Sequence, residues 1–299
     1  MWKLDTSGNS NLKQAQLSRL ASQLQEVLDG EKEVVFSGGE PLLYQGLNDI
    51  ISEYSQKGFK VGLASNGVLV DNKMAKQLVE AGLKTIQLSF DSCHEKTHDF
   101  LRGVDGVYKK VLEAASCLSR YKDKLSLCAQ TVISGKNINE IVDTVEFVAR
   151  DPRFDCISFM AVTTPFFASL DSDWRFSEEF SFLWPKEKAE IDLVMDKIID
   201  MKKSGYPIAN PVPHLELFRS YFHDYTKRNN STKCSLGDYV ISVDPQGDVR
   251  LCCFMPPVAN IAKDSLNEVF DSQKTDELRQ KMKSCQSLCN TLVNCFWEE

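Results

Sequence analysis

EVVFSGGEP, residues 33–41, is a short apolar run followed by two glycines, a glutamate and a proline. The apolar run predicts a strand that is covered on both faces. Gly38 and Gly39 let the backbone approach a ligand closely and expose its N–H groups, and the Glu40 carboxylate is suited to an ammonium group. The same residues, ending in Pro41, also fit a tight strand-to-helix turn with a solvated glutamate. This stretch alone therefore does not separate a ligand-binding loop from an ordinary turn.

The pattern of a short apolar run followed by an amphipathic segment repeats along the chain. Further strands are expected at 60–64, 85–90, 125–133 and 155–161, and helices at 11–29, 46–57, 71–81, 107–121 and 137–149. Strands that alternate regularly with helices predict a parallel α/β fold, either an open sheet or a barrel. In such folds ligands bind at the carboxyl ends of the strands.

Polar residues follow two further predicted strands at those carboxyl ends. Ser65 and Asn66 end the second strand, Ser89 and Asp91 end the third, and Arg102 follows in the third loop. Each cluster alone is typical of a common turn, and Arg102 fits either a carboxylate clamp or a helix-capping surface residue. Together with Glu40 they predict a polar ring around one site, which suits a small zwitterionic ligand that bears hydroxyl groups.

The pattern changes after residue 161. A long helix is expected at 186–203, a mixed connector at 206–233, a β-hairpin over 239–243 and 249–252, and a helix near 265–283. The chain is therefore predicted to divide into a barrel-like unit, residues 1–205, and a small C-terminal hairpin and helix unit, residues 206–299.

Cysteine is unusually frequent, with ten residues in a 299-residue chain. Six of them lie close together in the C-terminal unit: Cys234, Cys252, Cys253, Cys285, Cys289 and Cys295. Four thiolates from a hairpin and a loop can hold one tetrahedral metal ion or one cubane cluster, and spacing alone does not separate zinc from [4Fe–4S]. The alternative is a set of reduced cysteines in a small core. The remaining four, Cys93, Cys117, Cys128 and Cys156, are expected to be small buried apolar residues.

Composition excludes several classes of function. The net charge is −7 and no run of lysine and arginine occurs, so nucleic-acid binding is not expected. No apolar stretch approaches the ~18 residues of a membrane span, and the polar N-terminal stretch is no signal peptide, so the cytoplasm is predicted. The four histidines, His94, His98, His214 and His223, form no recognised ligand pair and are expected at the surface or in caps.

Together these residues resemble the radical S-adenosylmethionine (SAM) superfamily with a C-terminal SPASM or twitch-type auxiliary domain. Residues 37–41 resemble the GGEP motif that meets the SAM amino group, and Ser65-Asn66-Gly67 the loop after it. Ser89, Asp91 and Arg102 resemble positions near the SAM ribose and carboxylate, and residues 157–160 a strand near the adenine. The segment from Cys234 to Cys252 resembles the C-x9–15-G-x4-C element of the auxiliary domain. The last three cysteines resemble its C-x2-C-x5-C element, with one extra residue between Cys285 and Cys289.

The resemblance implies a six-stranded (βα)6 partial barrel, here incomplete and lacking its first strand, that binds SAM. It implies hydrogen-atom abstraction from a peptide or small-molecule substrate, with an electron donor such as flavodoxin or ferredoxin. The cysteine count supports one auxiliary [4Fe–4S] cluster, with Cys234, Cys252, Cys285, Cys289 and Cys295 as its candidate ligands. The extra residue leaves open whether Cys253 or Cys295 replaces Cys285.

One departure from the family is large. The C-x3-C-x2-C motif that binds the SAM cluster is absent, because the first cysteine of the chain is Cys93. We expect a chain that lacks its true N-terminus and is catalytically inactive alone. Two alternatives remain from the sequence: a non-catalytic relic of a SAM site that acts as a binding or scaffold protein, and an α/β protein stapled by zinc.

Overall fold

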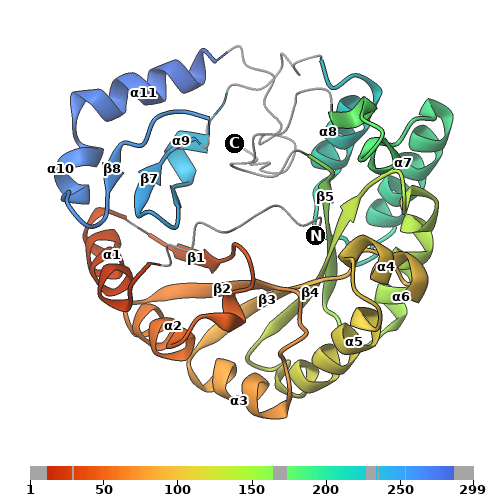
Figure 1. The fold of residues 1–299 in the computed structure, drawn as a ribbon, viewed down its shortest axis with the longest axis horizontal. Helices are drawn as coiled ribbons and strands as arrows, with labels where there is room; N and C mark the ends of the chain where they lie inside the picture. The colour runs from red at the N-terminus through yellow and green to blue at the C-terminus, as the bar shows by residue number, and fades with distance from the viewer. Residues whose placement is uncertain are drawn as a thin grey trace.

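The computed structural model describes residues 12–28, 30–163, 174–226, 234, 236–252 and 254–285. Within this part of the chain, five parallel strands form one sheet in the order β1-β2-β3-β4-β5. The strands are β1 (Lys32–Phe36), β2 (Phe59–Ser65), β3 (Leu83–Ser89), β4 (Ser126–Ile133) and β5 (Cys156–Ala161). The sheet curls into a half-barrel with helices on its outer face (Figure 1). The predicted α/β partial barrel is thereby confirmed.

Helix α1 precedes the first strand, the helices after it connect successive strands, and together they cover the convex face of the sheet. They are α1 (Gln14–Val27), α2 (Leu47–Gln56), α3 (Asn72–Glu80), α4 (Glu95–Arg102), α5 (Val107–Leu118) and α6 (Ile141–Arg150). After β5 the chain adds α7 (Lys188–Lys203) and α8 (Val212–His223), which pack against each other. All of the strand-to-strand connections are therefore of the parallel crossover type that places ligand-binding loops at one edge of the sheet.

Side chains alternate between the two faces of the sheet, as the period of a strand requires. Leu63, Ile86, Ala129 and Ile157 are buried against the outer helices. Burial of each large apolar side chain contributes about 1.5–3 kcal/mol to stability, so this layer holds the half-barrel together. The alternate residues on the inner, concave face are largely polar and half-buried: Gln87, Ser89, Gln130 and Ser158.

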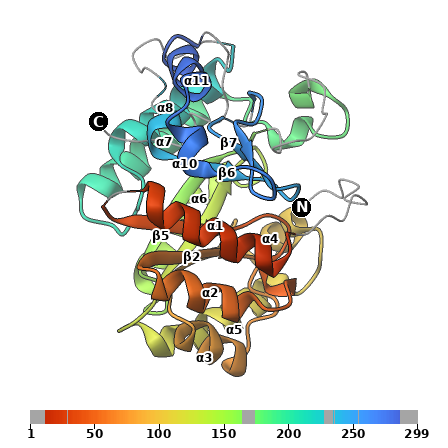
Figure 2. The same ribbon diagram turned by 90° about the vertical axis from the view of Figure 1, so that its left-hand side faces the viewer.

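A small C-terminal unit lies beside the mouth of the half-barrel. It has an antiparallel sheet of β6 (Ser242–Val243), β7 (Asp248–Arg250) and β8 (Ala259–Asn260), with α9 (Leu236–Tyr239), α10 (Leu266–Phe270) and α11 (Gln273–Lys283). Helix α10 packs against α1 (Figure 2). The Arg19 guanidinium of α1 donates hydrogen bonds to the carbonyl oxygens of Ala262 and Asp264, at 2.9 and 3.1 Å.

Several elements differ from those that the sequence predicts. Helices α4 and α8 were not expected, and α8 lies inside the predicted connector 206–233. The predicted strand 239–243 begins with the last residue of α9, so the hairpin is shorter than expected and gains the third strand β8. The predicted helix 265–283 is broken into α10 and α11, because the Ser272 side chain caps the second helix by accepting a hydrogen bond from the Thr275 N–H.

Residues between α7 and α8 are attached to the half-barrel. Ile208 forms a parallel bridge with Ile157 of β5, and the Ala209 N–H donates to the Ile157 carbonyl at 2.8 Å. This short segment therefore covers the open edge of β5. Among the residues that the structure describes, no helix has both the length and the hydropathy needed to cross a lipid bilayer.

Candidate functional site at the carboxyl edge of the half-barrel

The loop after β1 exposes its backbone at the carboxyl edge of the sheet. Gly38 and Gly39 are exposed, and a Cβ at either position would meet no atom within 4 Å. Gly38 has a φ of +127°, a conformation that only glycine adopts without strain. Pro41 then begins a 3-10 turn that Glu40 caps, because the Glu40 Oε1 accepts a hydrogen bond from the Leu42 N–H at 3.2 Å. The loop is thus fixed in shape while its glycines stay open to a ligand.

Glu40 joins the ends of β1 and β2. Its Oε1 accepts a hydrogen bond from the Ser65 hydroxyl at 2.7 Å, and its Oε2 accepts one from the Asn66 N–H at 2.8 Å. The Ser65 Oγ in turn accepts the Gly67 N–H at 3.0 Å, and the Asn66 Oδ1 accepts the Val68 N–H at 2.9 Å. The structure therefore brings these predicted site residues together and assigns Glu40 a role in orienting the second loop.

An ion pair closes the end of β3. The Arg102 Nη2, from the last turn of α4, lies 2.7 Å from the Asp91 Oδ2, and the Asp91 Oδ1 accepts the Val132 N–H at 3.0 Å. The two side chains are only 17% and 7% exposed. Arg102 is therefore the partner of a buried carboxylate of the protein itself, and its role toward a ligand carboxylate stays a prediction.

Two residues that the sequence did not point to hold Asp91 in place. The fully buried Asn137 donates from Nδ2 to the carbonyl oxygens of Asp91 and Val132, at 2.7 and 2.9 Å. The His98 Nδ1 accepts the Asp91 N–H at 3.1 Å, so the imidazole is neutral at that nitrogen. Burial lowers the pKa of His98 to about 4, which keeps the ring neutral at physiological pH.

The histidine prediction was wrong for two of the four residues. His98 is fully buried on α4, and His214 is buried on α8, where its ring lies 4.4 Å from that of Phe218. His94 is exposed and His223 is half-buried. The error has one physical cause, since both buried histidines lie on helices that the sequence pattern did not reveal.

The concave face adds a row of polar side chains beneath the loops. The register of the strands places Ser89 opposite Gln130, and Gln130 opposite Ser158. Gln130 was missed, although its position two residues before Val132 in a strand puts it on the inner face by alternation. These hydroxyl and amide groups can bind the ribose and base of a nucleoside, so the donor set at this edge fits SAM.

The predicted metal ligands fall in two groups. Cys234, Cys252 and Cys285 are half-buried, whereas Cys289, Cys295 and the alternative ligand Cys253 lie outside the described residues. Within the part of the chain that the structure describes, no three His, Cys, Asp or Glu side chains form a metal-binding group. The Phe254 N–H donates to the Cys252 Sγ at 3.4 Å, a contact that favours a thiolate and is typical of sulfur that ligates iron.

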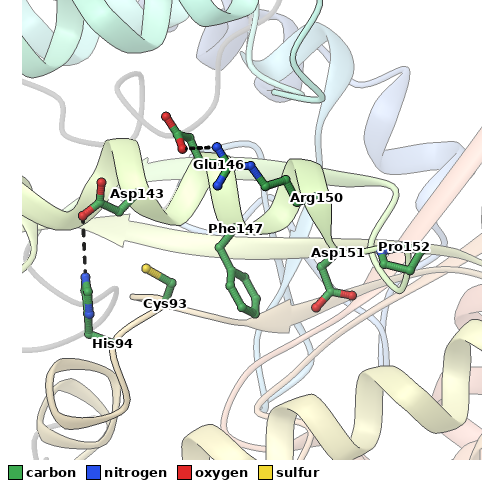
Figure 3. Close-up of a pocket in the computed structure, with 8 residues that line it drawn as sticks. All are labelled: Cys93, His94, Asp143, Glu146, Phe147, Arg150, Asp151 and Pro152. Carbon is green, nitrogen blue, oxygen red and sulfur yellow. Dashed lines mark hydrogen bonds and ion pairs between the residues drawn. The ribbon is translucent and has the colours of Figure 1, made fainter.

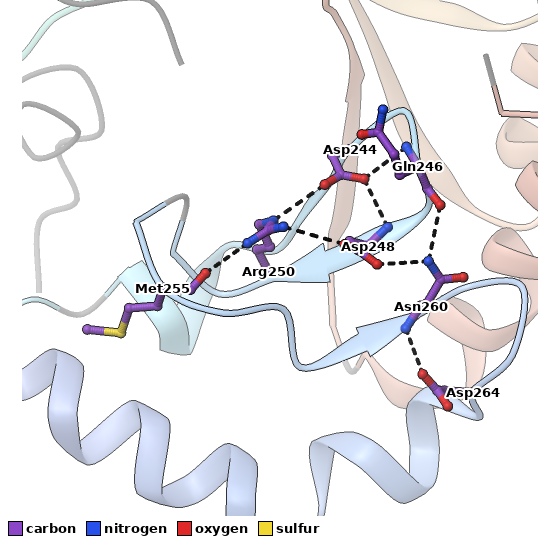
Figure 4. A network of polar contacts seen from close by, with 7 residues as sticks. All are labelled: Asp244, Gln246, Asp248, Arg250, Met255, Asn260 and Asp264. Carbon is purple, nitrogen blue, oxygen red and sulfur yellow. Dashed lines mark hydrogen bonds and ion pairs between the residues drawn. The ribbon is translucent and has the colours of Figure 1, made fainter. Parts of the chain in front are cut away.

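A polar network fixes the hairpin that precedes Cys252 (Figure 4). The Asp244 Oδ1 accepts the N–H groups of Gln246 and Asp248, at 2.9 and 3.0 Å, which shapes the turn. Arg250 donates from Nη1 to the Met255 carbonyl at 2.9 Å and thereby spans the loop that carries Cys252. These contacts therefore hold the shape of the hairpin and of the loop that carries Cys252.

A surface pocket of about 610 Å³ lies between the loop after Asp91, at Cys93 and His94, and α6 (Figure 3). The Glu146 carboxylate and the Arg150 guanidinium pair at 2.6 Å along its wall. Burial, the largest effect, raises the pKa of the Cys93 thiol, so Cys93 stays protonated and is a poor nucleophile. The pocket therefore provides no activated group for catalysis.

Comparisons with known proteins match both units of the chain. Residues 6–148 match the model of the radical SAM superfamily, and residues 234–296 match that of the SPASM iron–sulfur cluster-binding domain. Fe-coproporphyrin III synthase of Methanosarcina barkeri is 24% identical over 180 residues, which are 60% of this chain and 42% of the relative. PqqA peptide cyclase of Bradyrhizobium diazoefficiens is 30% identical over 144 residues, which are 48% and 37% of the two chains. The chain thus spans less than half the length of these relatives.

Solved structures share the fold over nearly the whole chain. The structure of native anSMEcpe with bound AdoMet matches with a TM-score of 0.66 at 19% sequence identity. The match covers 99% of this chain and 83% of the anSMEcpe chain. The structure of Streptococcus suis SuiB bound to the precursor peptide SuiA matches with a TM-score of 0.66 at 16% sequence identity. This match covers 94% of this chain and 66% of the SuiB chain. At these identities the likeness concerns the fold of the half-barrel and of the C-terminal unit.

Proposed function

Because residues 6–148 belong to the radical SAM superfamily and residues 234–296 to the SPASM iron–sulfur cluster-binding domain, we propose that this chain acts in a radical SAM enzyme that abstracts a hydrogen atom from a peptide substrate. The observation that carries the proposal is the Glu40 bridge to Ser65 and Asn66, beside the Asp91–Arg102 pair at the next strand end. A small-molecule substrate is the alternative, because Fe-coproporphyrin III synthase is among the similar proteins beside PqqA peptide cyclase and peptide-bound SuiB.

The cofactors that the family implies are SAM and iron–sulfur clusters. SAM supplies a carbon radical when it is bound to a reduced cluster. In this chain the open backbone of Gly38 and Gly39 would bind the polar end of SAM, and Glu40 would accept its ammonium group while holding the second loop. Ser89, Gln130 and Ser158 would bind the ribose and base. The Asp91–Arg102 pair would hold the loop after β3 in position between these two groups of residues.

The SAM cluster needs thiolates that the 299 residues do not provide near this edge, because no cysteine precedes Cys93. We therefore propose that this chain alone binds SAM weakly and yields no 5′-deoxyadenosine, even with a reductant such as flavodoxin or ferredoxin. A reducing compartment such as the cytoplasm would keep the C-terminal thiolates available for iron. If SAM binds tightly to the isolated chain and no radical chemistry follows, a non-catalytic binding role would replace this proposal.

We propose one auxiliary [4Fe–4S] cluster in the C-terminal unit, with ligands drawn from Cys234, Cys252, Cys285, Cys289 and Cys295. The test is anaerobic reconstitution of the full chain with iron and sulfide, followed by metal and sulfide analysis. We expect about four irons per chain with acid-labile sulfide. Cys252→Ala should lose the cluster, whereas Cys117→Ala, a change at a half-buried cysteine of α5, should retain it. One zinc per chain without sulfide would overturn the cluster in favour of a structural zinc site.

A further inference from the structure

Two cysteines face each other on β4 and β5, two residues before the Gln130–Ser158 pair of the proposed SAM site. Cys128 lies near the start of β4 and Cys156 begins β5, and the two are paired residues in the parallel register. Their side chains share the concave face, because each lies two residues before a member of the Gln130–Ser158 pair. Adjacent strands are separated by about 4.8 Å, within the roughly 4.4–6.8 Å between Cα atoms that a disulfide requires.

The two thiols differ in their surroundings. Cys128 is buried, and its Sγ lies 3.6 Å from the Ala129 carbonyl oxygen. Cys156 is half-buried, so a reagent can reach it first. The contact with Cys156, together with burial, raises the pKa of Cys128. The hydrogen bond from Cys128 lowers the pKa of Cys156, and the positive charge of Lys202 acts in the same direction. Cys156 is thus the better nucleophile, and Cys128 lies beside it as the second thiol of the pair.

We propose that Cys128 and Cys156 form a thiol–disulfide exchange site that reacts with low-molecular-weight disulfides of the glutathione class. The Cys156 thiolate attacks one sulfur of the disulfide, forming a mixed disulfide and releasing one glutathione thiolate, which takes up a proton. The Cys128 thiol then loses its proton and attacks the Cys156 sulfur, which forms the Cys128–Cys156 disulfide and releases the second glutathione. The two electrons of the dithiol pass to glutathione disulfide, which is reduced.

The reaction would join β4 and β5 covalently beneath Gln130 and Ser158. Disulfides in reducing compartments are usually transient and serve catalysis or redox sensing, so a reversible cross-link is the expected form. Cys117 offers an internal comparison, because it is also half-buried but lies on α5, away from the β4–β5 ladder.

The test uses the full chain, fully reduced and then exposed anaerobically to oxidised glutathione. After rapid acid quenching and alkylation, peptide mapping should find the Cys128–Cys156 disulfide in the unmodified chain. In Cys128→Ser the mixed disulfide should accumulate on Cys156, at a rate about tenfold above that of Cys117 in the same sample. In Cys156→Ser, glutathione should add to Cys128 no faster than to Cys117.

Two outcomes would overturn the proposal. One is the absence of the Cys128–Cys156 disulfide in the unmodified chain while Cys117 reacts with glutathione. The other is equal glutathione addition to Cys156 and Cys117 in Cys128→Ser. The first measurement needs no variant, so it holds even if a serine substitution prevents folding.

Discussion

The Asp91 carboxylate and the Arg102 guanidinium lie 2.7 Å apart at the end of β3, and both side chains are largely buried. Asp91 is also held by the Val132 N–H, and the backbone of Asp91 is bound by Asn137 and His98. A buried carboxylate with this many partners has one position. The pair therefore ties the end of β3 to α4, and the Val132 N–H ties Asp91 to β4, at the edge where the SAM site is proposed.

Removal of the arginine tests this arrangement directly. In Arg102→Ala the Asp91 carboxylate is left buried without its counterion, and we expect the free energy of unfolding to fall by about 3 kcal/mol. Denaturant unfolding followed by circular dichroism measures the change. Lys76→Ala removes an exposed i,i+4 pair with Glu80 and should have almost no effect. Equal stability of the two variants would show that the pair does not hold the loop.

Asn137 provides a second test of the same loop without any change of charge. Asn137→Ala removes the donors to the carbonyl oxygens of Asp91 and Val132 and the acceptor of the Ser134 N–H; the Asp91 and Ser134 bonds are buried and the Val132 bond is partly buried. The unsatisfied groups should lower the free energy of unfolding by about 3 kcal/mol. The matched control is Asn72→Ala, at an exposed position of α3, which should unfold near the wild-type midpoint. A shift no larger than that of the control would contradict the role given to Asn137.

Glu40 links structure to ligand binding. In Glu40→Gln one carboxylate oxygen becomes an NH2 group, which cannot accept the Asn66 N–H, and the charge for an ammonium group is lost. We expect SAM affinity to fall about tenfold or more, measured by equilibrium dialysis with the cluster-loaded protein. Glu33→Gln is the control, because Glu33 makes only an exposed pair with Lys60 at 3.4 Å. Unchanged affinity in Glu40→Gln would remove Glu40 from the SAM site.

His98 predicts how stability depends on pH. The pKa of His98 is lowered from 6.5 to about 4, mainly by burial, with Asp91, Arg102 and Asp99 as the charged neighbours. The unfolded chain therefore binds a proton below about pH 6.5 that the folded chain does not bind until about pH 4. The contribution is present above pH 6.5 and is lost as the pH falls, by about 2 kcal/mol between pH 7 and pH 5.

The measurement compares unfolding free energies at these two pH values. In His98→Gln the glutamine amide oxygen can still accept the Asp91 N–H, and the pH dependence should become shallower by that amount. His94→Gln, at an exposed position, should keep the wild-type slope. An identical slope in His98→Gln would mean that the ring takes up its proton at the ordinary pKa.

The sequence predicts the sheet well because short strands alternate regularly with amphipathic helices, although β1 is only partly buried and the concave face is more polar than expected. Short apolar stretches such as Lys60 to Ala64 stand out between the helical segments, and the carboxyl ends of parallel strands must lie side by side. That geometry alone brings Glu40 next to Ser65 and Asn66. The prediction of the site depended on the order of the strands, which in this sheet is the order of the sequence.

The missed residues lie where the pattern carries no apolar signal. Helix α4 is short and buries Thr97, His98 and Asp99, all polar, so no buried apolar face marks it. Helix α8 does have a buried apolar face, but Pro211 and Pro213 at its start suggest a connector. Strand β8 has only two residues, too few for any period.

The clasp between Arg19 and Asp264 joins positions 245 residues apart in the chain. At a translation rate of roughly 5–20 residues per second, about 10–50 seconds separate the synthesis of the two partners. Helix α1 is therefore synthesised well before its partner, and this contact cannot form until residue 264 has been made. Docking of the C-terminal unit onto α1 is thus restricted to the end of synthesis or to the time after it.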